Sequence, residues 1–127
     1  MFPQLLQYNN VGLFLLRLVI GIIFLYHALP KLKNTKAMAQ GMGWPSGMIF
    51  LLGTVELLSS LGLMFGIYRQ LAALLLCFVM IGAIKMKTMK WHVPFMGMTN
   101  TGWEFDLILL AANIAILLTG GGSIGIW

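Results

Sequence analysis

Polar side chains inside long apolar runs are the residues of this sequence with the strongest potential for chemistry. Arg17, Glu56 and Asn113 each lie within such a run. A charged side chain at the centre of a membrane-spanning helix costs about 2.5–3.5 kcal/mol even on lenient scales. Counting 1.5 Å per residue from the lysine-bearing end of each run places the three residues at similar depths, roughly 14–18 Å. We therefore predict that they converge on one level inside a helical bundle.

Two interpretations of this buried set remain open. In the first, Arg17 and Glu56 form a direct or water-bridged ion pair that sets the register of two helices, and Asn113 is a hydrogen-bond partner. In the second, the three side chains line a cavity and bind a ligand. Gly53 and Ser60 share a helix face with Glu56, and small residues there let another helix approach closely.

A second set of polar residues lies near the ends of the runs. On the first run Arg17, His27 and Lys31 fall along one side, together with Gly21 and Phe24. We predict a pocket at this end, in which the side chains of His27 and Glu104 face each other. Its predicted lining residues are His27, Lys31, Lys85, His92 and Glu104, with Asp106 near the same level. The alternative is that these groups extend separately into water.

The sequence does not favour a haem site or a Cu(I) site. His27 and His92 could be axial ligands of a haem, but two histidines on the same side of a four-helix protein often arise by chance. Four methionines and His92 between residues 86 and 98 have a spacing that would suit Cu(I). Methionine is also a common filler of apolar cores. Cys77 is the only cysteine, which excludes an intramolecular disulfide and dithiol chemistry.

Helices that cross a membrane must position these side chains. The chain has 127 residues, of which 60% are apolar and 9% charged, whereas soluble domains have roughly 45–50% and 25%. We predict one all-α domain over residues 1–127, an integral membrane, antiparallel four-helix bundle. Pro30 is predicted to break or kink the first helix, and Gly120–Gly122 to end the last. The predicted helices cover residues 11–30, 46–66, 70–87 and 104–119.

The basic residues predict the orientation of this bundle. The net charge is +5, and the lysines cluster between residues 31 and 36 and between residues 85 and 90. Both clusters lie at one face, in the first and third loops, and the opposite face has only Arg69. The positive-inside rule then places these loops in the cytoplasm of a prokaryote, with the protein in its plasma membrane and both termini outside. This arrangement disfavours nucleic acid as a partner.

Three segments of the sequence resemble the DoxX family of small four-helix membrane proteins. They are LLRLVIGIIFLYHALPKL (15–32), GTVELLSSLGLMFGIYRQLAALLL (53–76) and GWEFDLILLAANIAILLTGGG (102–122). The sequence departs from the family pattern at Ala28, where glycine is usual, and at Gly121, where proline is common. The resemblance implies a four-helix membrane fold. The family is named for a subunit of an archaeal thiosulfate:quinone oxidoreductase, and distant relatives act as receptors or chaperones.

Two functional hypotheses follow. The first is a membrane subunit of a quinone-linked oxidoreductase, in which His27 and Glu104 exchange protons with a quinone. A partner subunit, a second copy of the chain or a bound cofactor would supply electrons. The alternative is a non-catalytic membrane chaperone, assembly factor or lipid-binding protein. The remaining predicted ligand-binding residues are Arg17, Lys31, Glu56, Lys85, His92 and Asn113.

Overall fold

The computed structural model describes residues 2–96 and 102–125. Within these residues the chain is helical and has no strand, which confirms the predicted all-α fold. A 3-10 turn, Pro3–Tyr8, precedes helix α1, and a π-helical turn, Met86–Lys90, follows helix α4 directly. The helices are α1 (Asn9–Lys33), α2 (Thr35–Met42), α3 (Ser46–Phe65), α4 (Arg69–Lys85) and α5 (Trp103–Thr119).

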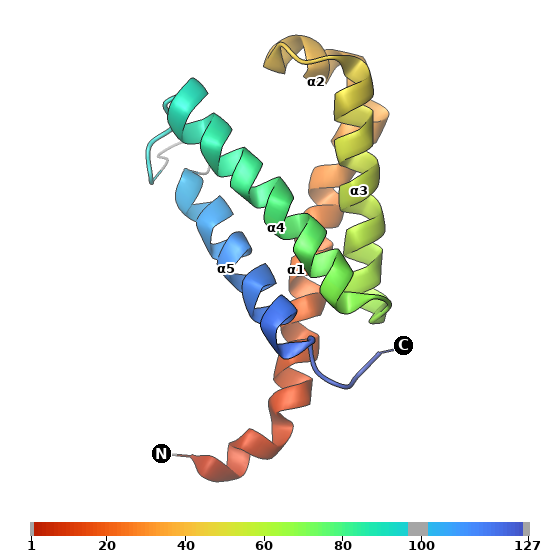
Figure 1. Ribbon diagram of the computed structural model, residues 1–127, viewed down its shortest axis with the longest axis vertical. Helices are drawn as coiled ribbons and strands as arrows, with labels where there is room; N and C mark the ends of the chain where they lie inside the picture. The colour runs from red at the N-terminus through yellow and green to blue at the C-terminus, as the bar shows by residue number, and fades with distance from the viewer. Residues whose placement is uncertain (1, 97–101, 126–127) are drawn as a thin grey trace.

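The four long helices form two closely packed pairs. Helix α1 packs along α3, and α4 packs along α5. The pairs meet where α3 ends at Phe65 and α4 begins at Arg69, which we call the closed end. They diverge towards the end where α4 finishes at Lys85 and α5 begins at Trp103, which we call the open end (Figure 1). Helix α2 crosses the open end beside the start of α3.

The segment after residue 29 differs most from the prediction. Helix α1 continues through Pro30 to Lys33, so the predicted end at Pro30 is wrong. Proline removes one backbone donor but keeps its carbonyl, and the Pro30 carbonyl accepts a hydrogen bond from the Asn34 amide at 2.8 Å. The polar stretch that follows forms α2, which the sequence did not predict. The Thr35 hydroxyl donates to the Lys31 carbonyl at 2.6 Å at the junction between the two helices.

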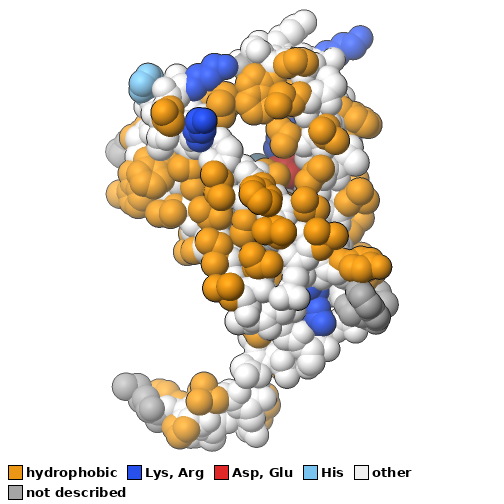
Figure 2. Space-filling view, viewed as in Figure 1, with side chains coloured by type: hydrophobic (Ala, Val, Ile, Leu, Met, Phe, Trp, Pro, Cys, Tyr) orange, Lys and Arg blue, Asp and Glu red, His pale blue; other side chains and the backbone are white. Residues whose placement is uncertain are grey.

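The exposed surface of the helices is strongly apolar. Three described helical stretches, Pro3–Lys33, Ser46–Phe65 and Arg69–Lys90, are long and apolar enough to cross a membrane. Helix α5 is mainly apolar but has 17 residues. Large apolar side chains cover the middle of the face shown in Figure 2. Exposed examples from the four long helices are Leu15, Val19, Leu51, Leu58, Phe78, Ile81, Ile108 and Leu118. Apolar exposure on this scale is typical of a surface that faces lipid.

Two glycines set the distance between α1 and α3. A Cβ atom at Gly21 would lie 2.9 Å from the Ser60 carbonyl oxygen, and one at Gly53 would lie 2.9 Å from the Cβ of Lys31. Distances this short leave no space for a larger side chain. The predicted close approach of a second helix around Glu56 is therefore confirmed, and it is α1 that approaches.

The closed end depends on a glycine at the end of α3. Gly66 has φ +73°, and a Cβ atom there would lie 2.5 Å from the Cα of Gly125. Gly66→Ala is expected to lower the free energy of unfolding by about 2–4 kcal/mol, because backbone strain adds to the displacement of the C-terminal segment. Gly12→Ala is the matched control, since nothing lies within 4 Å of its added Cβ. Chemical unfolding in detergent should show a stability equal to or above that of the parent for Gly12→Ala. Equal losses in both variants would contradict the packing at Gly66.

Candidate functional site

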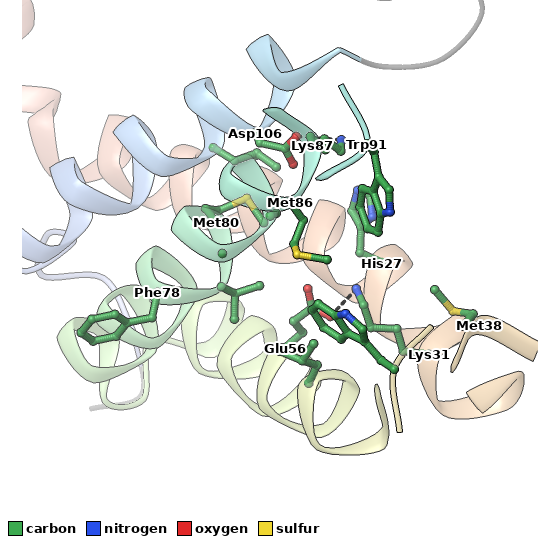
Figure 3. A pocket seen from close by; sticks show the side chains of 16 residues that line it. His27, Lys31, Met38, Glu56, Phe78, Met80, Met86, Lys87, Trp91 and Asp106 are labelled. Atoms are coloured by element: carbon green, nitrogen blue, oxygen red, sulfur yellow. Dashed lines mark ion pairs between the residues drawn. The ribbon is translucent and has the colours of Figure 1, made fainter. Parts of the chain in front are cut away.

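A cleft opens between the two helix pairs at the open end. Its volume is about 260 Å³, and Figure 2 shows a hollow in this part of the surface with an acidic side chain at its bottom. Leu52, Val79, Met80 and Leu109 are among the apolar residues that form its walls. The ionisable groups that line it are His27, Lys31, Glu56, Lys87 and Asp106 (Figure 3). An apolar cleft with a few polar groups is the usual form of a site for a small molecule.

The first ion pair of the cleft joins α1 to α3. Lys31 Nζ lies 2.7 Å from Glu56 Oε2, and the two side chains are 14% and 2% exposed. The contact between Gly53 and Lys31 brings the two groups together, because Gly53 and Glu56 lie three residues apart on the same face of α3. Both charges are thus compensated within the α1–α3 pair.

The second ion pair joins the π-helical turn after α4 to α5. Lys87 Nζ lies 2.7 Å from Asp106 Oδ2, and the side chains are 21% and 7% exposed. Asp106 also lies in the first turn of α5, where a carboxylate interacts favourably with the helix dipole. The first ion pair lies within the α1–α3 pair and the second within the α4–α5 pair. Neither ion pair therefore connects the two sides of the cleft.

His27 is placed between these ion pairs. Its side chain comes from α1 and is exposed at the cleft. The ring centroids of His27 and Phe105 are 5.9 Å apart, so α1 and α5 approach each other here across the cleft. Trp91 also lines the cleft, and Figure 3 shows Met86 directed towards the space between His27 and Glu56. A titratable ring therefore faces the cleft with a charge pair on either side.

The predicted family is supported by a direct comparison. The family model described as DoxX matches residues 12–92, which is more than half of the chain. The chain belongs to the DoxX family. The matched segment of this DoxX-family protein covers most of α1, all of α3 and α4, and the π-helical turn after α4. These elements contribute His27, Lys31, Glu56 and Lys87 to the cleft. Asp106 lies on α5, outside the matched segment.

A curated relative of the DoxX-family protein comes from Bacillus subtilis (strain 168). It is 35% identical over 114 residues, which cover 87% of this chain and 81% of the relative. It is named "Putative oxidoreductase CatD". No solved structure matches the chain.

The lining of the cleft differs in part from the predicted pocket. His27 and Lys31 line it as predicted, but Lys85, His92 and Glu104 do not and are exposed. Their places are taken by close neighbours in the sequence: Lys87, Trp91 and Asp106. The predicted facing of His27 and Glu104 is therefore wrong.

The physical reason is the direction of each side chain around its helix. Two residues along a helix differ by roughly 200° in direction, so Glu104 and Asp106 point to opposite sides at nearly the same depth. The prediction used depth and left direction undetermined. Helical spacing does contain the missing signal, because Asp106, Leu109, Asn113 and Ile116 recur on one face. All four are buried.

The predicted direct pair of Arg17 and Glu56 is also wrong. Arg17 is fully buried and donates from Nη1 to the Leu63 carbonyl at 3.1 Å and from Nη2 to the Ile124 carbonyl. Glu56 pairs with Lys31 instead. The first helix was predicted to end at Pro30, whereas α1 continues to Lys33. Arg17 therefore lies further from the open end than its predicted depth.

Asn113 does not join these groups either. It is buried, and its Nδ2 donates to the Leu109 carbonyl of its own helix at 2.8 Å. The described residues contain no group of three or more His, Cys, Asp or Glu side chains suited to a metal ion. Of the methionines considered for Cu(I), Met86 lines the cleft and Met98 lies outside the described residues.

Proposed function

We propose that this DoxX-family protein is a membrane subunit of a redox complex and binds a lipophilic, quinone-like ligand in the cleft. The observation that carries the proposal is the exposure of His27 at an apolar cleft, with an ion pair on each side. Such a site suits a molecule with a polar ring and an apolar tail.

The polar groups of the cleft can hydrogen-bond to both the oxidised form of such a ligand, a quinone, and its reduced form, a quinol. The ammonium groups of Lys31 and Lys87 can donate hydrogen bonds to ring carbonyls. The carboxylates of Glu56 and Asp106 can accept hydrogen bonds from ring hydroxyls. Because each ion pair is neutral as a whole, a neutral head group is favoured over an anion. An apolar tail would lie along the walls near Met80 and Leu109 and continue towards the lipid.

His27 is the group best suited to exchange a proton with the ligand. Imidazole titrates near neutral pH, and this ring is exposed at the cleft. A quinone takes up two electrons and two protons on reduction, and a partner subunit would supply the electrons. The name of the Bacillus subtilis relative supports a connection with redox chemistry.

The position of the site in the membrane forms part of the proposal. We propose that α5 crosses the bilayer with α1, α3 and α4, which makes four crossings of a prokaryotic plasma membrane. Lysines at the open end favour its placement in the cytoplasm. The ligand would then exchange protons with the cytoplasmic side.

Quinone retained through purification tests the proposal. His27→Ala is expected to reduce the retained quinone about three- to tenfold, because a hydrogen bond to the head is lost. Glu104→Gln is the matched control, because Glu104 is exposed and lies outside the cleft. It should retain as much quinone as the parent protein, measured by solvent extraction and mass spectrometry.

Two outcomes decide between this function and its alternative. Quinone absent from the purified protein and not bound on addition would contradict the proposal. Retained phospholipid in its place, lost in His27→Ala, would favour the lipid-binding or chaperone function. A loss of quinone in Glu104→Gln equal to that in His27→Ala would show that the cleft is not the site.

A further inference from the structure

We propose that the cleft opens sideways into the bilayer between α3 and α4, and that Gly82 selects a ligand with a long hydrocarbon tail by leaving room for that tail. The proposal rests on the proposed function for the head group of the ligand. It adds the route by which the tail leaves the cleft and the residue that sets the width of this route.

The part of α4 that lines the cleft changes from charged to apolar along the chain. Lys87, just after the helix, lies at the open end, and Gly82 and Phe78 follow towards the middle of the helix. Phe78 lies about 10 Å before the last residue of α4, at 1.5 Å per residue. Figure 3 shows its ring at the edge of the cleft, apart from the charged side chains. A ligand whose head contacts the charged groups can therefore place its apolar part near Phe78.

The apolar part of the cleft reaches the outer surface of the bundle. Phe78 is 63% exposed although it lines the cleft, and Gly82 is also exposed. Ile81, next to Gly82, is exposed on α4, and Leu51, next to the lining residue Leu52, is exposed on α3. Figure 2 shows the hollow bordered mainly by hydrophobic side chains on this face. Because a surface of this composition faces lipid, the cleft opens here towards acyl chains.

Gly82 leaves open space in the wall of the cleft. A Cβ atom added at Gly82 would have nothing within 4 Å, whereas one at Gly53 would lie 2.9 Å from the Cβ of Lys31. Glycine destabilises a helix relative to alanine, and close packing explains that cost at Gly53 but not at Gly82. On the opposite side of the cleft the ring centroids of His27 and Phe105 are 5.9 Å apart. The side at Gly82 is therefore the one with room for a tail.

A quinone-like ring with a long hydrocarbon tail is the class of ligand that fits this shape. The ring would lie near the two ion pairs, and the tail would pass Gly82 and Phe78 into the lipid. A ring without a tail does not need the space at Gly82. Selection for the tail can thus be separated from binding of the ring.

Two quinones with the same ring test the proposal: phylloquinone, which has a long phytyl tail, and menadione, which has none. Binding to the protein in nanodiscs is measured by quenching of tryptophan fluorescence, because Trp44 and Trp91 line the cleft. Gly82→Leu should weaken the binding of phylloquinone about tenfold, because the new side chain fills the exit of the tail, and should leave menadione binding unchanged. Gly12→Leu is the matched control, since Gly12 is exposed and nothing lies within 4 Å of its added Cβ. It should bind both quinones as the parent does.

A phospholipid with a diazirine in its acyl chain gives a second readout that needs no quinone. In the parent protein, the photolabel is expected to reach Met80 and Leu109, which line the cleft but are only 5% and 2% exposed. Peptide mass spectrometry locates the labelled residues. Gly82→Leu should lose most of the label at Met80 and Leu109 and keep it at the exposed Leu51.

The outcomes separate this proposal from the proposed function. A Gly82→Leu variant that binds phylloquinone as the parent does would overturn the proposed exit, and so would an equal loss of both quinones. Absence of the photolabel from Met80 and Leu109 in the parent would overturn it as well. Failure of the parent to bind either quinone would contradict the proposed function, and the photolabel would still decide whether the cleft opens to lipid.

Discussion

Glu56→Gln is expected to lower the free energy of unfolding by about 3–5 kcal/mol, the usual cost of breaking a buried ion pair by removing one partner. Glu56 is almost fully buried, and its carboxylate lies 2.7 Å from Lys31 Nζ. The neutral amide would leave the ammonium of Lys31 in a low-dielectric site without a counter-charge. Chemical unfolding in detergent, followed by tryptophan fluorescence, measures the loss.

Two variants show whether this loss belongs to the ion pair. Glu104→Gln removes an exposed carboxylate from the same end of the bundle and should change the stability by less than about 0.5 kcal/mol. The double variant Lys31→Met with Glu56→Leu should recover much of the loss, because it leaves neither charge unpaired. An unchanged stability in Glu56→Gln, or a double variant less stable than Glu56→Gln, would rule out the pair as a stabilising contact.

Arg17→Met is expected to lower the free energy of unfolding by about 3–5 kcal/mol and to release the C-terminal segment. Arg17 donates to the carbonyl of Leu63 in the last turn of α3, where carbonyls lack a partner within the helix. It also donates to the carbonyl of Ile124. Each charge-assisted hydrogen bond contributes about 1.5–3 kcal/mol. Methionine keeps the apolar stem but supplies no donor.

Hydrogen exchange measured by mass spectrometry distinguishes this effect from a general loss of stability. Peptides that cover residues 121–125 should exchange faster in Arg17→Met under conditions in which α4 stays protected. Lys33→Met, at an exposed position of the open end, should leave the same peptides unchanged. Equal protection of residues 121–125 in Arg17→Met and the parent would contradict the role given to Arg17.

These two interactions stabilise different parts of the molecule. Arg17 connects α1 to the end of α3 and to the C-terminal segment, so it stabilises the end at which the two helix pairs meet. The Lys31–Glu56 pair acts within the α1–α3 pair, so it stabilises that pair at the open end.

The sequence by itself determined the class of the protein and most of its helices. Continuous apolar runs require helices in lipid, because each backbone donor and acceptor must be satisfied within the segment. The predicted ranges 46–66 and 104–119 agree with α3 and α5 to within one residue at each end. The prediction that Arg17, Glu56 and Asn113 are interior residues also holds, since all three are buried. An intramembrane polar side chain is too costly to face lipid, so its burial follows from composition alone.

Only the tertiary structure decided which charges meet. Depth along a helix can be counted from the sequence, but the direction of a side chain depends on how the helix is rotated against its neighbours. Glu104 and Asp106 have nearly the same depth, and the packing of α5 turned Asp106 inward and Glu104 outward. The continuation of α1 past Pro30 likewise shifted the register against α3, so that Lys31 reached Glu56 and Arg17 did not. Helix rotation and register result from close packing at positions such as Gly21 and Gly53, and packing between distant segments cannot be read from local spacing.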